Sequence, residues 1–121
     1  MCDTPSLVKN FAADQYMGTW YTVAHSKGMP FNPDSWSCGN AIYGALETDG
    51  SFKLYNSSET KHQVGPRYGV NGTGQASPYT SGEITVSINN QVVNEPNYFI
   101  IDTDYDNYAI VYNCSSKFNG L

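Results

Sequence analysis

The chain has 121 residues, with 11 acidic side chains against 6 basic ones and a net charge of −5. The shortage of Lys and Arg excludes a nucleic-acid binder that works through a basic face, because phosphate contacts need cationic side chains. The length fits one domain over residues 1–121, and no apolar run approaches the roughly 20 residues of a membrane span.

Helical periodicity is almost absent, and the best helical candidate is a short N-terminal segment over residues 6–15. From residue 18 onward the pattern favours strands of about ten residues separated by turn residues. The predicted strands are 18–27, 37–47, 52–58, 67–76, 80–89, 96–103 and 108–115. Strands with this even spacing, antiparallel and in nearest-neighbour order, indicate an all-β domain, either an up-and-down barrel or a sandwich.

Three connections stand out between these strands. The pair Asp49-Gly50 predicts a tight hairpin, since such pairs accept the positive φ angles of the turn. A second turn is predicted at residues 104–107. Residues 28–36 contain two prolines and read as a large loop, which carries Phe31 and Trp36.

Two motifs, in the right order, resemble the signature of the lipocalin family. The first is residues 16–21 (YMGTWY), in which Gly18 and Trp20 form the Gly-x-Trp element that opens the first strand. The second lies in the last turn and consists of Thr103, Asp104 and Tyr105. The resemblance covers essentially the whole chain and is nearest to the group that contains apolipoprotein D and the bilin- and carotenoid-binding lipocalins. It implies an up-and-down antiparallel β-barrel with a short helical turn before its first strand.

The resemblance also implies an eighth strand, with an Arg that stacks on the motif Trp. This sequence ends at Leu121, soon after the seventh predicted strand, and neither Arg67 nor Lys117 occupies the position of that Arg. Long unpaired sheet edges promote association. We therefore expect a second chain or a neighbouring subunit to supply the eighth strand, or an irregular closure of the barrel.

Barrel strands alternate between inward and outward side chains, which defines the residues expected to line the interior. Alternation alone also fits the ordinary core of a filled β-domain, but with the family resemblance a ligand cavity becomes the favoured interpretation. Phe31 and Trp36 of the long loop are expected to cover its mouth. The other expected ligand-binding residues are Thr22, Ala24, Ala41, Tyr43, Leu54, Asn56, Val86, Ile88, Tyr98, Ile100, Val111 and Asn113.

The leading hypothesis is a secreted carrier that holds a small hydrophobic ligand noncovalently, with no catalytic cofactor. The resemblance implies a ligand such as a carotenoid, a bilin, a lipid or a steroid. Affinity would come from apolar burial, and a few polar side chains would orient the ligand. The candidates for that polar role are Tyr43, Asn56, Tyr98 and Asn113.

Two other functions are weighed against the carrier. An assembly module would follow from the missing strand, with the function in the complex. An isomerase would need a cavity thiol, and Cys38 lies at the start of the second strand. Its position resembles a disulfide-forming cysteine of the related group instead, so an enzyme is not expected.

A metal site is not expected either. Asp102, Asp104 and Asp106 have the spacing that starts a calcium-binding EF-hand loop. That loop needs Gly at its sixth position and Glu at its twelfth, where this chain has Asn107 and Asn113. The histidines, His25 and His62, have no ligand-spaced neighbours and read as surface residues.

Three N-x-[ST] sequons and a low Lys content favour secretion. The start of the chain lacks the features of a signal peptide, so such a peptide is expected to have been removed. Asn56 and Asn113 are predicted to point inward, where a glycan does not fit. Asn71 is therefore the expected glycosylation site.

The cysteines are Cys2, Cys38 and Cys114, and the lipocalin resemblance implies a disulfide between the first and the last. Such a bond would close a loop on the order of 100 residues and contribute up to about 4–5 kcal/mol in the chain-entropy model. It would leave Cys38 as a thiol or bonded to a separate polypeptide.

Overall fold

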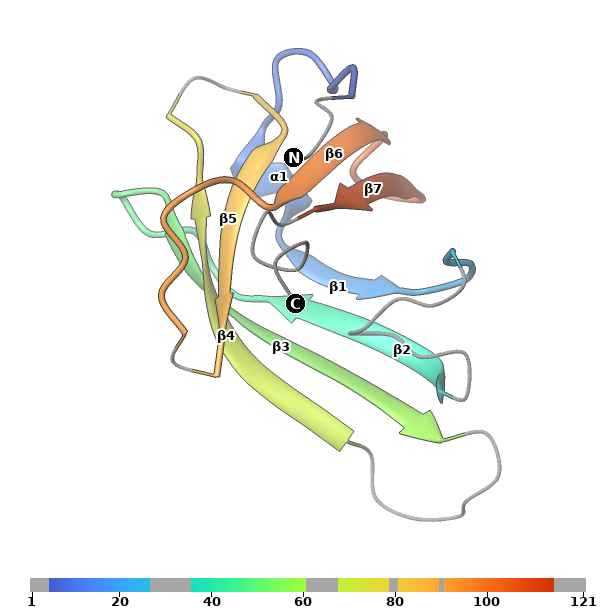
Figure 1. The fold of residues 1–121 in the computed structure, drawn as a ribbon. Coiled ribbons are helices and arrows are strands. Elements are labelled where there is room, and N and C mark those ends of the chain that lie inside the picture. Colours follow the sequence, from blue (N-terminus) through green and yellow to red (C-terminus); the bar gives the residue numbers. More distant parts are fainter. Residues whose placement is uncertain (1–4, 27–35, 61–67, 79–80, 90, 115–121) are drawn as a thin grey trace.

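The structure is a computed structural model that describes residues 5–26, 36–60, 68–78, 81–89 and 91–114. Its strands form one antiparallel sheet in sequential order, which curls into a half-barrel (Figure 1). A short helix, α1 (Ala13–Tyr16), precedes the sheet. The strands are β1 (Gly18–Tyr21), β2 (Trp36–Tyr43), β3 (Ser51–Thr60), β4 (Tyr68–Ala76), β5 (Glu83–Ile88), β6 (Tyr98–Thr103) and β7 (Ala109–Asn113). The expectation of seven antiparallel strands in nearest-neighbour order is confirmed.

The N-terminal prediction was wrong in its length. Helix is confined to α1, whereas a helix over residues 6–15 was expected. The residues before α1 contact the sheet instead: the Val8 amide donates to the Ile100 carbonyl at 3.1 Å. Asn10 then adopts a φ of 54°, which a right-handed helix cannot contain.

The first strand is also shorter than the predicted 18–27. β1 ends at Tyr21, and one further backbone bond joins the Thr22 amide to the Gly39 carbonyl at 2.8 Å. Gly39 lies where the β2–β3 register shifts, between Ser37 and Asn40. Cys38 within this irregularity has a φ of 55°. The regular ladder between β1 and β2 therefore stops where β2 becomes irregular.

The predicted hairpin between β2 and β3 is present. The Gly50 amide donates to the Glu47 carbonyl at 3.0 Å, and Gly50 has a φ of 85°, which favours glycine. The Asp49 carboxylate accepts from the Ser51 amide at 2.9 Å. This hairpin fixes the register in which Tyr43 pairs with Leu54. Both side chains consequently point to the concave face.

The core lies on that concave face, under the N-terminal segment. Fully or nearly fully buried side chains from the N-terminal segment, α1, β2, β3, β5 and β6 meet there. They are Phe11, Tyr16, Tyr43, Phe52, Leu54, Ile84 and Ile100. Strand alternation therefore gives the sheet one apolar concave face, as the sequence predicted.

The turn between β6 and β7 is held by the Asp104 carboxylate. Its Oδ1 accepts from the Asn107 amide at 2.7 Å and from the Tyr108 amide at 3.0 Å. Thr103 Oγ1 adds a donation to the Tyr108 carbonyl at 2.7 Å. The Asn107 side chain, which donates to Asp104 Oδ2, and then the amides of Asn107 and Tyr108 lower the pKa of Asp104 to about 2. The Thr-Asp-Tyr motif thus closes this turn, as predicted.

We predict that this turn gives the fold a pH-dependent component of stability. A carboxyl whose pKa is lowered on folding stabilises the fold above its unfolded pKa, and the contribution is lost as the pH falls towards 2. Asp104→Asn should therefore lower the melting temperature at pH 7, and its difference from the wild type should shrink between pH 4 and pH 2. Asp106→Asn is the control. Equal pH profiles for both variants would contradict this role.

Candidate functional site

The concave face of the sheet is the candidate binding surface. Most of the expected lining residues belong to the core or pack against it, namely Ala41, Tyr43, Leu54, Val86, Tyr98, Ile100 and Val111. Asn56 and Ile88 share the face of their inward neighbours and are partly exposed. We call this concave face, with its buried and partly exposed side chains, the cup.

Three further expected residues lie at the margins of the cup. Thr22 and Ala24 are exposed and lie beyond the end of β1, and Asn113 is exposed at the end of β7. Phe31 and the side chain of Trp36 fall outside the described residues. Their expected role at the mouth stays a prediction.

Stacked aromatic rings close one end of the cup. The Tyr16 ring stacks on Trp20 at 5.0 Å and on Tyr43 at 5.8 Å between centroids. Trp20 Nε1 also donates to the Tyr16 carbonyl at 2.8 Å. Phe11 meets the same ring edge-on at 5.4 Å and stacks on Tyr105 at 6.0 Å. The two sequence motifs therefore join at this end, through Tyr16 and Phe11.

Three tyrosine hydroxyls form a polar point inside this apolar end. Tyr43 Oη donates to Tyr98 Oη at 3.1 Å, and the oxygens of Tyr16 and Tyr98 are 2.7 Å apart. Burial is the first cause that raises the pKa of all three residues above the ordinary tyrosine value. The three hydroxyls therefore stay protonated at neutral pH and act as hydrogen-bonding groups.

A second polar group on the concave face is the Asn56 side chain. Its Oδ1 is buried and makes no hydrogen bond. Asn56 pairs with Ala41 on β2 and with Val70 on β4, so the nearest cross-strand side chains are apolar. Buried polar atoms usually have a partner, which makes this oxygen a candidate contact for a ligand group or a water molecule.

Glycine on β4 shapes the floor of the cup. Gly74 pairs with Phe52, and the Phe52 ring lies directly on the Gly74 backbone, where a Cβ atom would overlap it. A Cβ atom on Gly72, the neighbouring inward position, would lie 3.2 Å from Leu54 and 3.3 Å from Ile88 and would overlap the Ser87 carbonyl oxygen. The aromatic and aliphatic side chains of β3 thus lie flat against β4.

A separate depression of about 610 Å³ lies at the closed end of the sheet rather than in the cup. Residues 10–14 form one wall, and the turns around Asp49 and Ser77 form the others. None of the expected ligand-binding residues lines it. The candidate binding site is therefore the concave face and not this depression.

Other predicted sites have mixed outcomes. Cys114 is disulfide-bonded, but its expected partner Cys2 lies outside the described residues, so that pairing stays a prediction. Cys38 is exposed.

Within the part of the chain that the structure describes, no three His, Cys, Asp or Glu side chains are grouped as metal ligands. The same part holds no helix that is long and apolar enough to cross a bilayer.

Sequence reasoning missed two residues of this site. Tyr16 is part of the first motif, but its hydrogen bond with the Tyr98 hydroxyl was not predicted. Phe11 was not expected to join that motif to Tyr105. The available signal was the position of both residues in the segment that leads to Gly18 and Trp20, together with the 10 tyrosines of the chain.

Comparisons with known proteins agree with this geometry. Residues 17–120 match the model of the lipocalin / cytosolic fatty-acid binding protein family. The chain is 30% identical to the Lazarillo protein of Schistocerca americana over 96% of its own length and 53% of that protein. It is 28% identical to apolipoprotein D of Oryctolagus cuniculus over 95% of its length and 58% of that protein. It thus spans less than two thirds of the curated relatives it matches.

We predict that Gly74→Ala disturbs the floor of the cup. The added methyl group must displace the Phe52 ring, and overpacking of this kind costs about 1–3 kcal/mol of unfolding free energy. Gly39→Ala is a matched control, because its Cβ meets only the Thr22 side chain, at 3.2 Å. Urea unfolding measures both variants, and an equal loss in the two would contradict the packing described.

Proposed function

Since the chain belongs to the lipocalin / cytosolic fatty-acid binding protein family, we propose that it carries a small hydrophobic ligand noncovalently in the cup. The observation that carries this proposal is the concave face, where apolar side chains surround the three tyrosine hydroxyls. Burial of a ligand against these side chains supplies affinity, and the polar groups orient it. Binding and release require no bond chemistry.

The proposal extends to the mouth and to the choice of ligand. Phe31 and Trp36 would cover the entrance, and Thr22, Ala24 and Asn113 would line its rim. A long planar pigment such as a carotenoid or a bilin would suit the aromatic floor, and a steroid or another lipid would use the same apolar burial. We propose a carrier without catalytic activity, with Cys38 as a structural residue.

Secretion belongs to the same proposal. Asn71 supports it, because this sequon asparagine is exposed on β4 and can accept a glycan without entering the cup. The disulfide of Cys114 also supports it, since such bonds persist in oxidising compartments. We propose Cys2 as the partner, which would tie the N-terminal segment to the end of β7.

Filling the cup tests the carrier function. Ala41 lies on the concave face between Trp20 and Asn56 in the strand register. We predict that Ala41→Trp weakens binding of the neutral fluorescent probe N-phenyl-1-naphthylamine by at least about tenfold, because the indole occupies space that the ligand needs. Fluorescence titration measures the affinity.

The neighbouring residue provides the matched control. Ile42 points outward and is 45% exposed, so Ile42→Trp adds the same side chain outside the cup and should leave the affinity unchanged. Val111→Trp and Ile110→Trp repeat the comparison on β7, in case Ala41→Trp does not fold. Probe binding that is equal in inward and outward variants would contradict a site in the cup.

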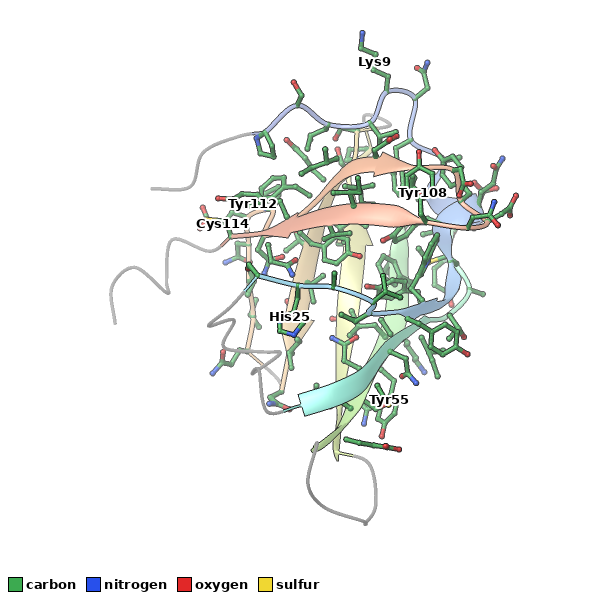
Figure 2. All side chains as sticks on the ribbon, turned by 90° about the vertical axis from the view of Figure 1, so that its right-hand side faces the viewer. Lys9, His25, Tyr55, Tyr108, Tyr112 and Cys114 are labelled. Atoms are coloured by element: carbon green, nitrogen blue, oxygen red, sulfur yellow. The ribbon has the colours of Figure 1, made fainter. Side chains whose placement is uncertain are left out.

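A second candidate function is assembly with another chain. The described sheet ends at β1 on one side and at β7 on the other, and these strands are not paired with each other although both views place them near one another (Figures 1 and 2). Large apolar side chains are exposed at or beside both edges, namely Tyr21, Val23 and Ile110. A strand from a second chain, or from a second copy, would cover them.

We predict that the chain associates through these edges. Sedimentation velocity should show a dimer or larger species whose population rises with concentration. Ile110→Lys should shift it towards monomer, because an outward charge at an edge opposes strand pairing. Tyr55→Lys, at an exposed position on the central strand β3, should not. A monomer at every concentration would contradict the assembly.

A further inference from the structure

The three tyrosine hydroxyls of the cup have one proton more than the hydrogen bonds between them use. Tyr16, Tyr43 and Tyr98 each carry one hydroxyl proton, and the cluster contains two hydrogen bonds. Two protons are used in those bonds. Among the described residues no other acceptor lies within bonding distance of these hydroxyls, so the third proton is available to a group that enters the cup.

We assign this third, available proton to the Tyr98 hydroxyl. Tyr16 is 1% exposed and Tyr43 is 9% exposed, whereas Tyr98 is partly exposed on the concave face. Tyr98 Oη accepts from Tyr43. Either hydroxyl can donate in the Tyr16–Tyr98 bond. In the arrangement in which Tyr16 donates, both lone pairs of Tyr98 are engaged and its own O–H is available to a ligand in the cup. A hydroxyl that accepts two hydrogen bonds is a stronger donor, because the bonds polarise one another.

Among the described residues, no Lys or Arg side chain lies on the concave face to pair with an anion. Lys9 and Lys53 are the cationic side chains of the described residues, and both are exposed. Lys9 points away from the sheet (Figure 2), and Lys53 alternates with the inward Phe52 and Leu54, so it lies on the convex side. Burial of a carboxylate without a paired cation is strongly unfavourable. Buried tyrosines that remain neutral can donate to a ligand oxygen but cannot balance its charge.

We propose that the cup selects an uncharged ligand with an oxygen that accepts a hydrogen bond from Tyr98, such as a ketone, and that it discriminates against a carboxylate of the same size. This inference rests on the proposed carrier function and adds the chemical class of the ligand. The unpartnered Asn56 Oδ1 is a hydrogen-bond acceptor, so it also disfavours a carboxylate placed beside it. Apolar burial provides the affinity, and the tyrosine cluster provides the selectivity.

Three ligands with a common alkyl chain separate these effects. 2-Tridecanone has an acceptor oxygen, dodecanoate has a charged carboxylate on the same chain, and tridecane has no polar group. Each is measured by its displacement of N-phenyl-1-naphthylamine. At pH 8 we expect 2-tridecanone to bind on the order of tenfold or more tightly than dodecanoate. The gap should narrow as the pH falls to 5, because more of the acid becomes neutral.

Substitution of the donor tests the role of Tyr98 itself. Tyr98→Phe should weaken 2-tridecanone binding by about three- to tenfold, the effect of one hydrogen bond, and leave tridecane unchanged. Tyr55→Phe is the control, since Tyr55 is exposed on the convex side. Tyr43→Phe keeps the Tyr98 proton and should have a smaller effect, which separates ligand contact from stability if Tyr98→Phe folds poorly.

The outcomes distinguish the two proposals. If dodecanoate at pH 8 binds as tightly as 2-tridecanone, or if Tyr98→Phe weakens tridecane and 2-tridecanone equally, the selectivity for uncharged oxygen ligands is wrong while the carrier function stands. If the naphthylamine probe does not bind at all, the carrier function is wrong, and the proposed selectivity for uncharged oxygen ligands is then wrong as well.

Discussion

The Tyr16 side chain connects the parts of this molecule that the chain places far apart. Its ring lies between Trp20 of the first motif and Tyr43 of β2, and its hydroxyl reaches Tyr98 of β6. Phe11 packs on the same ring from the N-terminal side. Aromatic contacts of this kind add about 0.5–1.5 kcal/mol each beyond the burial of area. One end of the curled sheet is thereby closed by packing, without a strand that bridges its edges.

This closure also explains why the three tyrosine hydroxyls lie at the closed end of the cup. A tyrosine buries a large apolar ring and still presents a hydroxyl, which needs a partner when it is buried. At the closed end the partners are other tyrosines, so this end is both tightly packed and able to form hydrogen bonds. The Asp104 turn lies outside this cluster and supports it indirectly, because it holds Tyr105 in place against Phe11.

The strand order, the hairpins and the concave set of residues could be predicted because they follow from local patterns. Alternation places Tyr43, Leu54 and Ile100 on one face whatever the curvature of the sheet. The helix over 6–15 could not be corrected from sequence, since Val8 is extended by its bond to Ile100, which is distant in the chain. The early end of β1 likewise depends on the irregularity in its neighbour.

The candidate site was predicted as a list of inward residues and not as an arrangement. Tyr43 and Tyr98 were expected to orient a ligand, but alternation cannot tell which inward hydroxyls touch. That contact depends on how far the sheet curls, which brings β2 and β6 face to face across the core. Tyr16 was missed for the same reason, because it precedes the first strand and has no place in a strand pattern.

The junction between β5 and β6 gives the sheet an internal division. Only Glu83–Phe99 and Ile84–Tyr98 are paired there, and beyond them the Asn97 side chain bonds the Val86 amide and carbonyl at 2.8 and 2.9 Å. The Asn97 side chain thus makes the two hydrogen bonds with Val86 that a backbone neighbour would otherwise make. The sheet thus divides into a five-stranded part, β1 to β5, and the β6–β7 hairpin, joined by a short paired segment. Local opening of a fold is easiest where backbone pairing is sparse. The Tyr98 hydroxyl belongs to the hairpin and its partner Tyr43 belongs to the five-stranded part. Opening of the β5–β6 junction would therefore separate these two hydroxyls and widen the cup at the same time.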